Sequence, residues 1–118
     1  EGSAVLVAHS SSCAAVAHLA QTTKHRIKAA FLVAPSDPLG AAYPAGPKGF
    51  APVPLVPLPF PSIVVASEND EYISLEQAEI YAKAWGSRFV NIGAKGHINA
   101  ASGLGEWQEG LELLKTLL

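Results

Sequence analysis

The sequence has a single cysteine, Cys13, and no long apolar run. One cysteine excludes an internal disulfide, and such sparse use is typical of a reducing compartment, so we expect a cytoplasmic protein. No apolar run reaches the roughly 18 residues needed to span a membrane, and we expect no membrane contact. The first residues, which begin with Glu1 rather than Met, lack the basic start and apolar region of a signal peptide.

Charged residues are also few: they make up 15% of the 118 residues, and the formal net charge is -2. No basic stripe is present that would neutralise phosphates, which excludes nucleic acid as an expected partner. The one local basic cluster, at residues 24–28, is interpreted as a solvated helix end. No cluster of His, Cys and carboxylates has metal-ligand spacing, and no glycine-rich loop follows a predicted strand. We therefore expect neither a metal nor an organic cofactor.

Hydrophobic residues, in contrast, make up 49% of the chain and gather in short runs. Continuous apolar runs are typical of strands buried on both faces of a parallel sheet, and parallel strands need crossovers, usually helices. The pattern predicts one domain over residues 1–118, with a three-layer α/β/α arrangement and a mostly parallel sheet. The predicted strands are Ala4–Ala8, Ala29–Ala34, Ser62–Ser67 and Arg88–Ile92, and the predicted helices are Ser11–Thr22, Leu75–Trp85 and Glu106–Leu118.

A proline-rich segment, Pro35–Pro61, separates the second and third predicted strands. It cannot form a regular helix, because proline removes backbone donors. Pro54 and Pro57 have the spacing of an SH3-type ligand. The many apolar side chains of the segment favour a different interpretation, an ordered loop that packs over the sheet.

The first predicted strand runs directly into Ala8-His9-Ser10-Ser11-Ser12. A serine flanked by small residues at a strand-to-helix turn is the nucleophile elbow pattern of α/β hydrolases. Centring the pattern on Ser11 places His9 where a small side chain is needed. Ser12 has small neighbours too, but it lies inside the predicted helix. We therefore prefer Ser10 as the nucleophile, with a helix-capping serine cluster as the alternative without chemistry.

Two more candidate residues follow later strands: Asp70 comes after the third strand and His97 after the fourth. The carboxyl ends of parallel strands are where α/β sheets place their sites. The chain order serine, acid, histidine is also that of α/β hydrolases. We expect Ser10, Asp70 and His97 to lie together as nucleophile, acid and base. Asp37 is interpreted as a turn residue, and His9 as part of the wall of the site.

Three stretches carry a resemblance to a known family, namely AHSSSC, APVPLVPLPFPSIVVASENDEYIS and GHINAASGLGEWQEG. They resemble the small serine hydrolase family of α/β hydrolases that includes the retinoblastoma-binding serine hydrolase. The resemblance covers essentially the whole chain. It implies a single-domain α/β-hydrolase fold without a large lid, hydrolysis of small esters or related acyl substrates, and Ser10, Asp70 and His97 as the catalytic triad.

The chain departs from the family pattern in two ways. The elbow has no glycine, since Ser12 stands at the position where the family usually has one. The family also has strands and helices before the elbow strand, which implies that this chain is the C-terminal portion of an α/β hydrolase, N-terminally truncated. The absent part carries the loop that donates the second oxyanion N–H, so the Ser11 backbone N–H is the one oxyanion donor expected here.

The expected function is that of a serine hydrolase that cleaves small ester or amide substrates through an acyl-enzyme. The alternative is a catalytically impaired, hydrolase-like interaction module, with the proline-rich segment as its contact surface. An elbow strand that begins the chain leaves one sheet edge unpaired. We therefore expect self-association through that edge, or complementation by a missing N-terminal segment.

Overall fold

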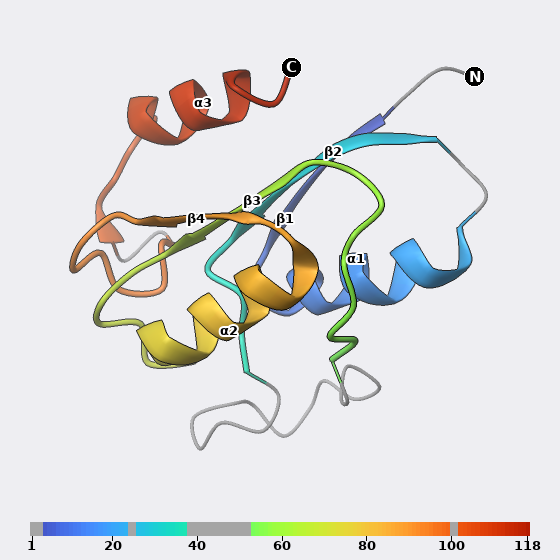
Figure 1. The fold of residues 1–118 in the computed structure, drawn as a ribbon. Helices are drawn as coiled ribbons and strands as arrows, with labels where there is room; N and C mark the ends of the chain where they lie inside the picture. The colour runs from blue at the N-terminus through green and yellow to red at the C-terminus, as the bar shows by residue number, and fades with distance from the viewer. Residues whose placement is uncertain (1–3, 24–25, 38–52, 100–101) are drawn as a thin grey trace.

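A computed structural model describes residues 4–23, 26–37, 53–99 and 102–118. These residues form a sheet with α1 and α2 on one face and α3 on the other (Figure 1). The strands pair in the order β1-β2-β3-β4, and every pair is parallel. The predicted α/β/α layering is confirmed. The strands are β1 (Ala4–His9), β2 (Ile27–Val33), β3 (Ser62–Ala66) and β4 (Arg88–Asn91), and the helices are α1 (Ser11–Thr22), α2 (Leu75–Trp85) and α3 (Gln108–Lys115).

The burial of each strand follows from its place in the sheet. β2 and β3 lie between neighbours, and all of β3 is buried, as its continuous apolar run predicted. β1 stands at the end of the order and has a mixed pattern, with Ala8 buried and Val7 63% exposed. Within the part of the chain that the structure describes, one edge of β1 therefore has no neighbouring strand.

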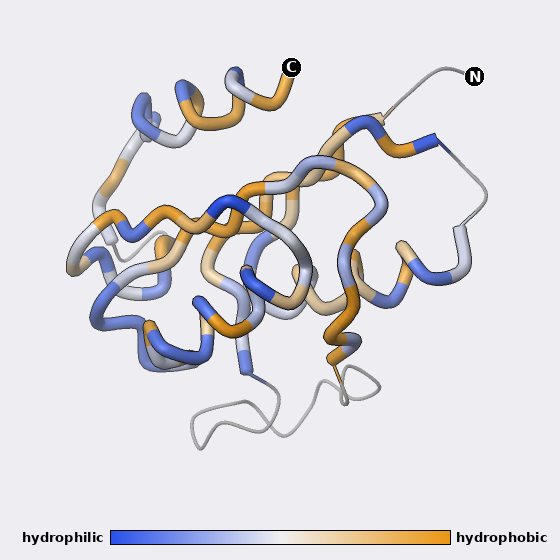
Figure 2. Tube along the Cα trace, in the orientation of Figure 1, coloured by the Kyte–Doolittle hydropathy of each residue, from blue (hydrophilic) through white to orange (hydrophobic). Residues whose placement is uncertain are grey.

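The buried apolar side chains form two clusters, one on each face of the sheet. Figure 2 shows hydrophobic residues along the strands and hydrophilic ones along much of the helices. Successive residues of a strand point to opposite faces, and β2 shows the consequence. Ala30 and Leu32 belong to the layer between the sheet and helices α1 and α2. Phe31 and Val33 belong to the layer that packs against residues of α3. Both faces of the sheet thus contribute to the core.

The described part of the proline-rich segment packs as the sequence predicted. Val53, Leu58 and Phe60 lie against the layer that contains α2. Two hydrogen bonds hold the segment to Trp85: the indole Nε1 donates to the Pro54 carbonyl at 2.8 Å, and the Trp85 carbonyl accepts from the Leu58 N–H at 2.9 Å. The rest of the predicted loop, residues 38–52, lies outside the described residues.

Helix ends follow their capping residues. The ends of α2 are as predicted: Ser74 Oγ accepts from the Gln77 N–H at 3.0 Å, and Gly86 has the left-handed conformation, with φ 72°. The third helix is shorter than the predicted Glu106–Leu118, because Gly105 (φ 59°) and Trp107 (φ 46°) turn the chain before it can begin. No helix among the described residues is long and apolar enough to cross a membrane.

Candidate active site

Ser10 occupies the sharp turn between β1 and α1. Its backbone has φ 63° and ψ -128°, a conformation that costs a residue other than glycine about 1–3 kcal/mol. The surrounding chain holds the turn, since the Ser10 N–H donates to the Val33 carbonyl at 3.0 Å. Ala8 is buried under the turn, whereas Ser12 is exposed in the first turn of α1. The strand-to-helix elbow that the sequence predicted is present and is centred on Ser10.

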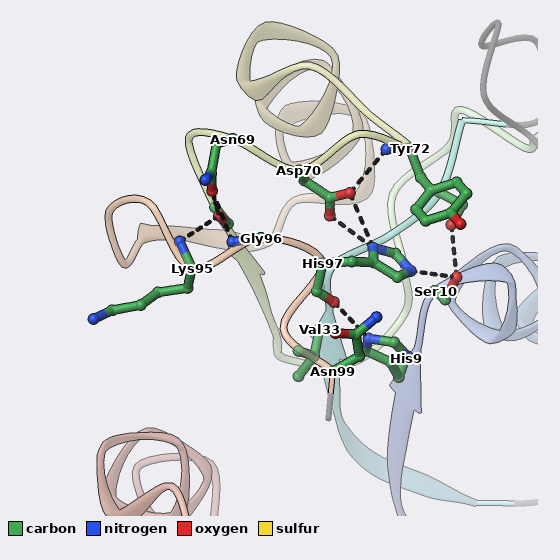
Figure 3. A network of polar contacts seen from close by, with 12 residues as sticks. His9, Ser10, Val33, Asn69, Asp70, Tyr72, Lys95, Gly96, His97 and Asn99 are labelled. Carbon is green, nitrogen blue, oxygen red and sulfur yellow. Dashed lines mark hydrogen bonds and ion pairs between the residues drawn. The ribbon is translucent and has the colours of Figure 1, made fainter. Parts of the chain in front are cut away.

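Ser10, His97 and Asp70 lie in hydrogen-bond contact at the C-terminal edge of the sheet (Figure 3). His97 Nε2 lies 2.8 Å from Ser10 Oγ. His97 Nδ1 lies 2.8 Å from Asp70 Oδ2 and 3.0 Å from Oδ1. The side chains of His97 and Asp70 are 8% and 0% exposed, so their interaction is shielded from water. The structure thus brings together the three residues that the sequence singled out.

The direction of the hydrogen bonds follows from the chemistry of the groups. An ionised carboxylate only accepts, so the proton of a neutral His97 ring lies on Nδ1 and is donated to Asp70. Nε2 is then an acceptor, and the Ser10 hydroxyl donates a hydrogen bond to it. Asp70 Oδ1 also accepts from the Tyr72 N–H at 2.9 Å. This arrangement has the tautomer that general-base activation of a serine requires.

Two side chains that the sequence analysis did not single out tie the loop after β3 to the loop that carries His97. Asn69 Oδ1 accepts from Ser67 Oγ at 3.0 Å and from the Gly96 N–H at 2.7 Å. Ser67 Oγ in turn accepts from the Lys95 N–H at 2.8 Å. These bonds fix the distance between the Asp70 and His97 loops. The only sequence signal was the Ser-x-Asn spacing that directly precedes Asp70.

The His97 ring is flanked by two other rings. The centroid of Tyr72 lies 4.5 Å from that of His97, and the centroid of His9 lies 4.7 Å from it. His9 also reaches the backbone of the same loop, because its Nε2 donates to the His97 carbonyl at 2.8 Å. His9 therefore forms part of the wall of the site, as its place in the elbow predicted. Tyr72 was not predicted.

The remaining candidates have other partners. Asp37 Oδ1 accepts from the Tyr81 hydroxyl at 3.5 Å, and the Asp37 N–H donates to the Tyr72 carbonyl at 3.1 Å. Ser11 is the first residue of α1, directly after the nucleophile candidate. Cys13 is fully buried, and burial raises the pKa of its thiol far above the usual range, which rules it out as a thiolate nucleophile. Among the described residues, no group of three or more possible ligands surrounds a metal position.

The model of the serine hydrolase family matches residues 1–116, nearly the whole chain. This chain belongs to the serine hydrolase family. A comparison with the curated proteins found no match.

Solved structures agree with the family assignment. A protein from Pectobacterium atrosepticum described as a YdeN-like hydrolase is 33% identical, with a TM-score of 0.81, over 97% of this chain and 60% of that one. A hydrolase of the α/β superfamily from Xanthomonas campestris is 22% identical, with a TM-score of 0.65, and the match covers 98% of this chain and 60% of that one. The esterase domain of a Rhodothermus marinus protein is 20% identical, with a TM-score of 0.60, over 88% and 58%.

These likenesses confirm the predicted α/β-hydrolase fold. The two structures at 22% and 20% identity bear on the fold alone. The chain spans about 60% of the length of the first solved relatives.

Proposed function

We propose that this chain carries the catalytic centre of a serine hydrolase that cleaves small ester or amide substrates. The supporting observation is the continuous hydrogen-bond chain from Ser10 through His97 to Asp70, with separations of 2.8 Å at each step. We also propose that, within the serine hydrolase family, this chain belongs with the members that resemble the retinoblastoma-binding serine hydrolase. A cytoplasmic location is a further part of the proposal.

The proposed reaction proceeds through an acyl-enzyme. Ser10 Oγ attacks the carbonyl carbon of the substrate while His97 Nε2 takes the hydroxyl proton. The Asp70 carboxylate stabilises the positive charge that this places on the ring. His97 then gives the proton to the departing alcohol or amine, and a water molecule, activated by the same nitrogen, releases the acid and restores Ser10.

The negative charge of the tetrahedral intermediate needs hydrogen-bond donors. We assign one of them to the Ser11 backbone N–H, since the residue after the nucleophile supplies an oxyanion donor in α/β hydrolases. Its place at the start of α1 adds the favourable end of the helix dipole. In the family pattern the second donor comes from a loop in a segment that precedes the elbow strand.

The open side of β1 is where such a segment would pair. β1 ends the strand order, and an apolar hollow of about 410 Å³ lies beside it, lined by residues of β1, β2 and α3 that include Val7, Val33 and Trp107. We propose that a further strand adds to this edge and covers the hollow, completing the site. The longer solved relatives, of which this chain spans about 60%, support the idea.

Labelling with a fluorophosphonate, which modifies activated serines, tests the proposed function. We expect mass mapping of the purified chain to place the adduct on Ser10. Ser10→Ala should abolish labelling, whereas Ser11→Ala and Ser12→Ala should retain it. A folded chain with no labelled serine would favour the alternative, an impaired hydrolase-like interaction module. An adduct that persists in Ser10→Ala but vanishes in Ser12→Ala would show that Ser12 is the nucleophile.

A further inference from the structure

A second hydroxyl lies beside the nucleophile candidate. Ser36 Oγ is 2.7 Å from Ser10 Oγ, and Ser36 is only 4% exposed. Ser36 follows β2, so the contact joins two strand ends that are 26 residues apart in the sequence. No sequence pattern indicated a role for this serine beyond the turn that contains Asp37.

The hydrogen bond between the two hydroxyls has one direction while His97 is neutral. Ser10 has a single hydroxyl proton and donates it in the hydrogen bond to His97 Nε2, which is the acceptor because Nδ1 carries the ring proton that faces Asp70. Ser10 Oγ is therefore the acceptor, and Ser36 is the donor. The two hydrogen bonds therefore point the same way: Ser36 donates to Ser10, and Ser10 donates to His97.

The backbone before Ser36 is strained in a way that aims this residue at Ser10. Ala34 has φ 48°, in the left-handed region, although it is not glycine and is completely buried. Its N–H donates to the Val65 carbonyl at 2.8 Å, which holds the strained turn in place. Such strain costs about 1–3 kcal/mol and is found mainly at functional sites. Ser10 and Ile98, the residue after His97, are also strained at this end of the sheet.

We propose that Ser36 is a fourth member of the catalytic group, resting on the proposed hydrolase function. Its hydroxyl holds Ser10 Oγ in place and stabilises the negative charge that grows there as the proton moves to His97. A hydrogen bond to a charged oxygen is stronger than one to a neutral hydroxyl, so the effect is larger in the transition state than at rest. Once the bond to the acyl carbon has formed, Ser10 Oγ is an ester oxygen and a weaker acceptor.

The same bond acts again when the acyl-enzyme breaks down. Water gives a proton to His97 Nε2 and adds to the acyl carbon, the bond between that carbon and Ser10 Oγ breaks, and His97 passes this proton to the departing oxygen. Ser36 then stabilises the charge that gathers on Ser10 Oγ before the proton arrives. Both half-reactions therefore depend on Ser36.

Rates of fluorophosphonate labelling test this proposal on the full chain. We expect Ser36→Ala to lower the maximal labelling rate constant about 10-fold to 100-fold, the loss expected for one hydrogen bond to a charged group. The reagent concentration for half-maximal rate and the pH midpoint of labelling should stay unchanged, since Ser36 does not contact His97 in the proposed arrangement. Ser36→Cys keeps the volume but donates weakly, and should show the same loss, whereas Ser36→Thr keeps the hydroxyl and the rate.

The chain offers a matched control. Ser62 is also buried and pairs with a serine hydroxyl, that of Ser87, at 2.6 Å, but it stands at the start of β3, at the other end of the sheet. Ser62→Ala should label at the rate of the unmodified chain.

The possible results separate the two proposals. If the unmodified chain does not label, the proposed function falls, and the role of Ser36 falls with it. If the unmodified chain and Ser36→Ala are labelled equally fast, the proposed hydrolase function is supported and Ser36 has no role in the reaction. A smaller labelled fraction at an unchanged rate constant would also overturn the proposal, because it would show that Ser36 only supports folding.

Discussion

At the scale of single residues, the candidate site depends on a few buried polar groups whose partners are fully specified. Asp70 accepts both from His97 Nδ1 and from the Tyr72 N–H, which leaves its carboxylate in one orientation. Because the Asp70 side chain is 0% exposed, water cannot take the place of a lost partner. Such groups are costly to alter, and their substitution is the sharpest test of the arrangement.

Asp70→Asn should lower the fluorophosphonate labelling rate about 10³-fold to 10⁴-fold with little change in the fold. An amide donates as well as accepts, so the ring of His97 no longer needs its proton on Nδ1 and loses the tautomer that activates Ser10. Glu76→Gln, on the exposed first turn of α2, is the matched control and should label normally. Equal rates for both variants would remove Asp70 from the proposed triad.

The buried thiol of Cys13 leads us to expect that the stability of the chain depends on pH. Burial raises the pKa of its thiol, so the folded chain keeps a proton that the unfolded chain loses above about pH 8.5. The unfolded state then binds fewer protons, and the free energy of unfolding falls as the pH rises, by up to about 1.4 kcal/mol per pH unit. Below about pH 8.5 the thiol is protonated in both states, and its contribution to the free energy of unfolding is fully present.

Urea unfolding between pH 7 and pH 10 measures this effect. The unmodified chain should lose stability over this range more steeply than Cys13→Ala, which has no thiol. Parallel slopes for the two proteins would show that Cys13 does not titrate as its burial requires.

At the scale of elements, the packing of α3 depends on one glycine. Gly110 is buried, and a Cβ at this position would overlap the Trp107 ring. Trp107, in its strained left-handed conformation, lies against Gly110 at the start of the helix. The Trp107 ring also lies 6.2 Å from the ring of Phe31, which connects α3 to the sheet.

Gly110→Ala should therefore destabilise the chain, although alanine favours helices over glycine by roughly 0.5–1 kcal/mol. Displacing the half-buried Trp107 ring from its packing costs about 1–3 kcal/mol, which outweighs the gain in helix propensity. Thermal unfolding and tryptophan fluorescence would report the loss. Glu109→Ala, at the neighbouring exposed position, is the control and should be close to neutral. A more stable Gly110→Ala chain would show that the Trp107 ring moves aside freely.

At the scale of the whole molecule, the position of β1 matters most. The strand that leads into Ser10 stands at the end of the described order, and exposed strand edges recruit further strands. Charged side chains, lysine in particular, block such pairing. Val7, which is 63% exposed on β1, is the place for this test.

We expect the purified chain to self-associate in light scattering and to turn over esters poorly. Val7→Lys should shift it toward the monomer, whereas Ile80→Lys, at an exposed apolar residue of α2, should not. Adding the part of a longer relative that this chain does not span should raise turnover by about 10²-fold to 10³-fold, the value of one oxyanion donor. A stable monomer with full esterase turnover would contradict both the expected association through β1 and the proposed value of a second oxyanion donor.

The sequence by itself determined the layering and the four strands, and it predicted the three candidate site residues that the structure brings together. Continuous apolar runs predict buried parallel strands because both faces of such a sheet are covered. The predicted ends of α2 are correct because they depend on local signals, the capping side chain of Ser74 and the left-handed Gly86. Chain order and strand ends were enough to select Ser10, Asp70 and His97, since parallel strands bring their carboxyl ends to one edge.

Only the tertiary structure decided which groups support those residues. Ser36 reaches Ser10 because the left-handed turn at Ala34 redirects the chain, and no local pattern predicts a left-handed alanine. Tyr72 and His9 flank His97, and Ser67 and Asn69 tie the loops together, through contacts between segments that are distant in sequence. The predicted start of α3, at Glu106, was wrong for the same reason. The strained backbone of Trp107, directly before the helix, is held by packing rather than by local preference.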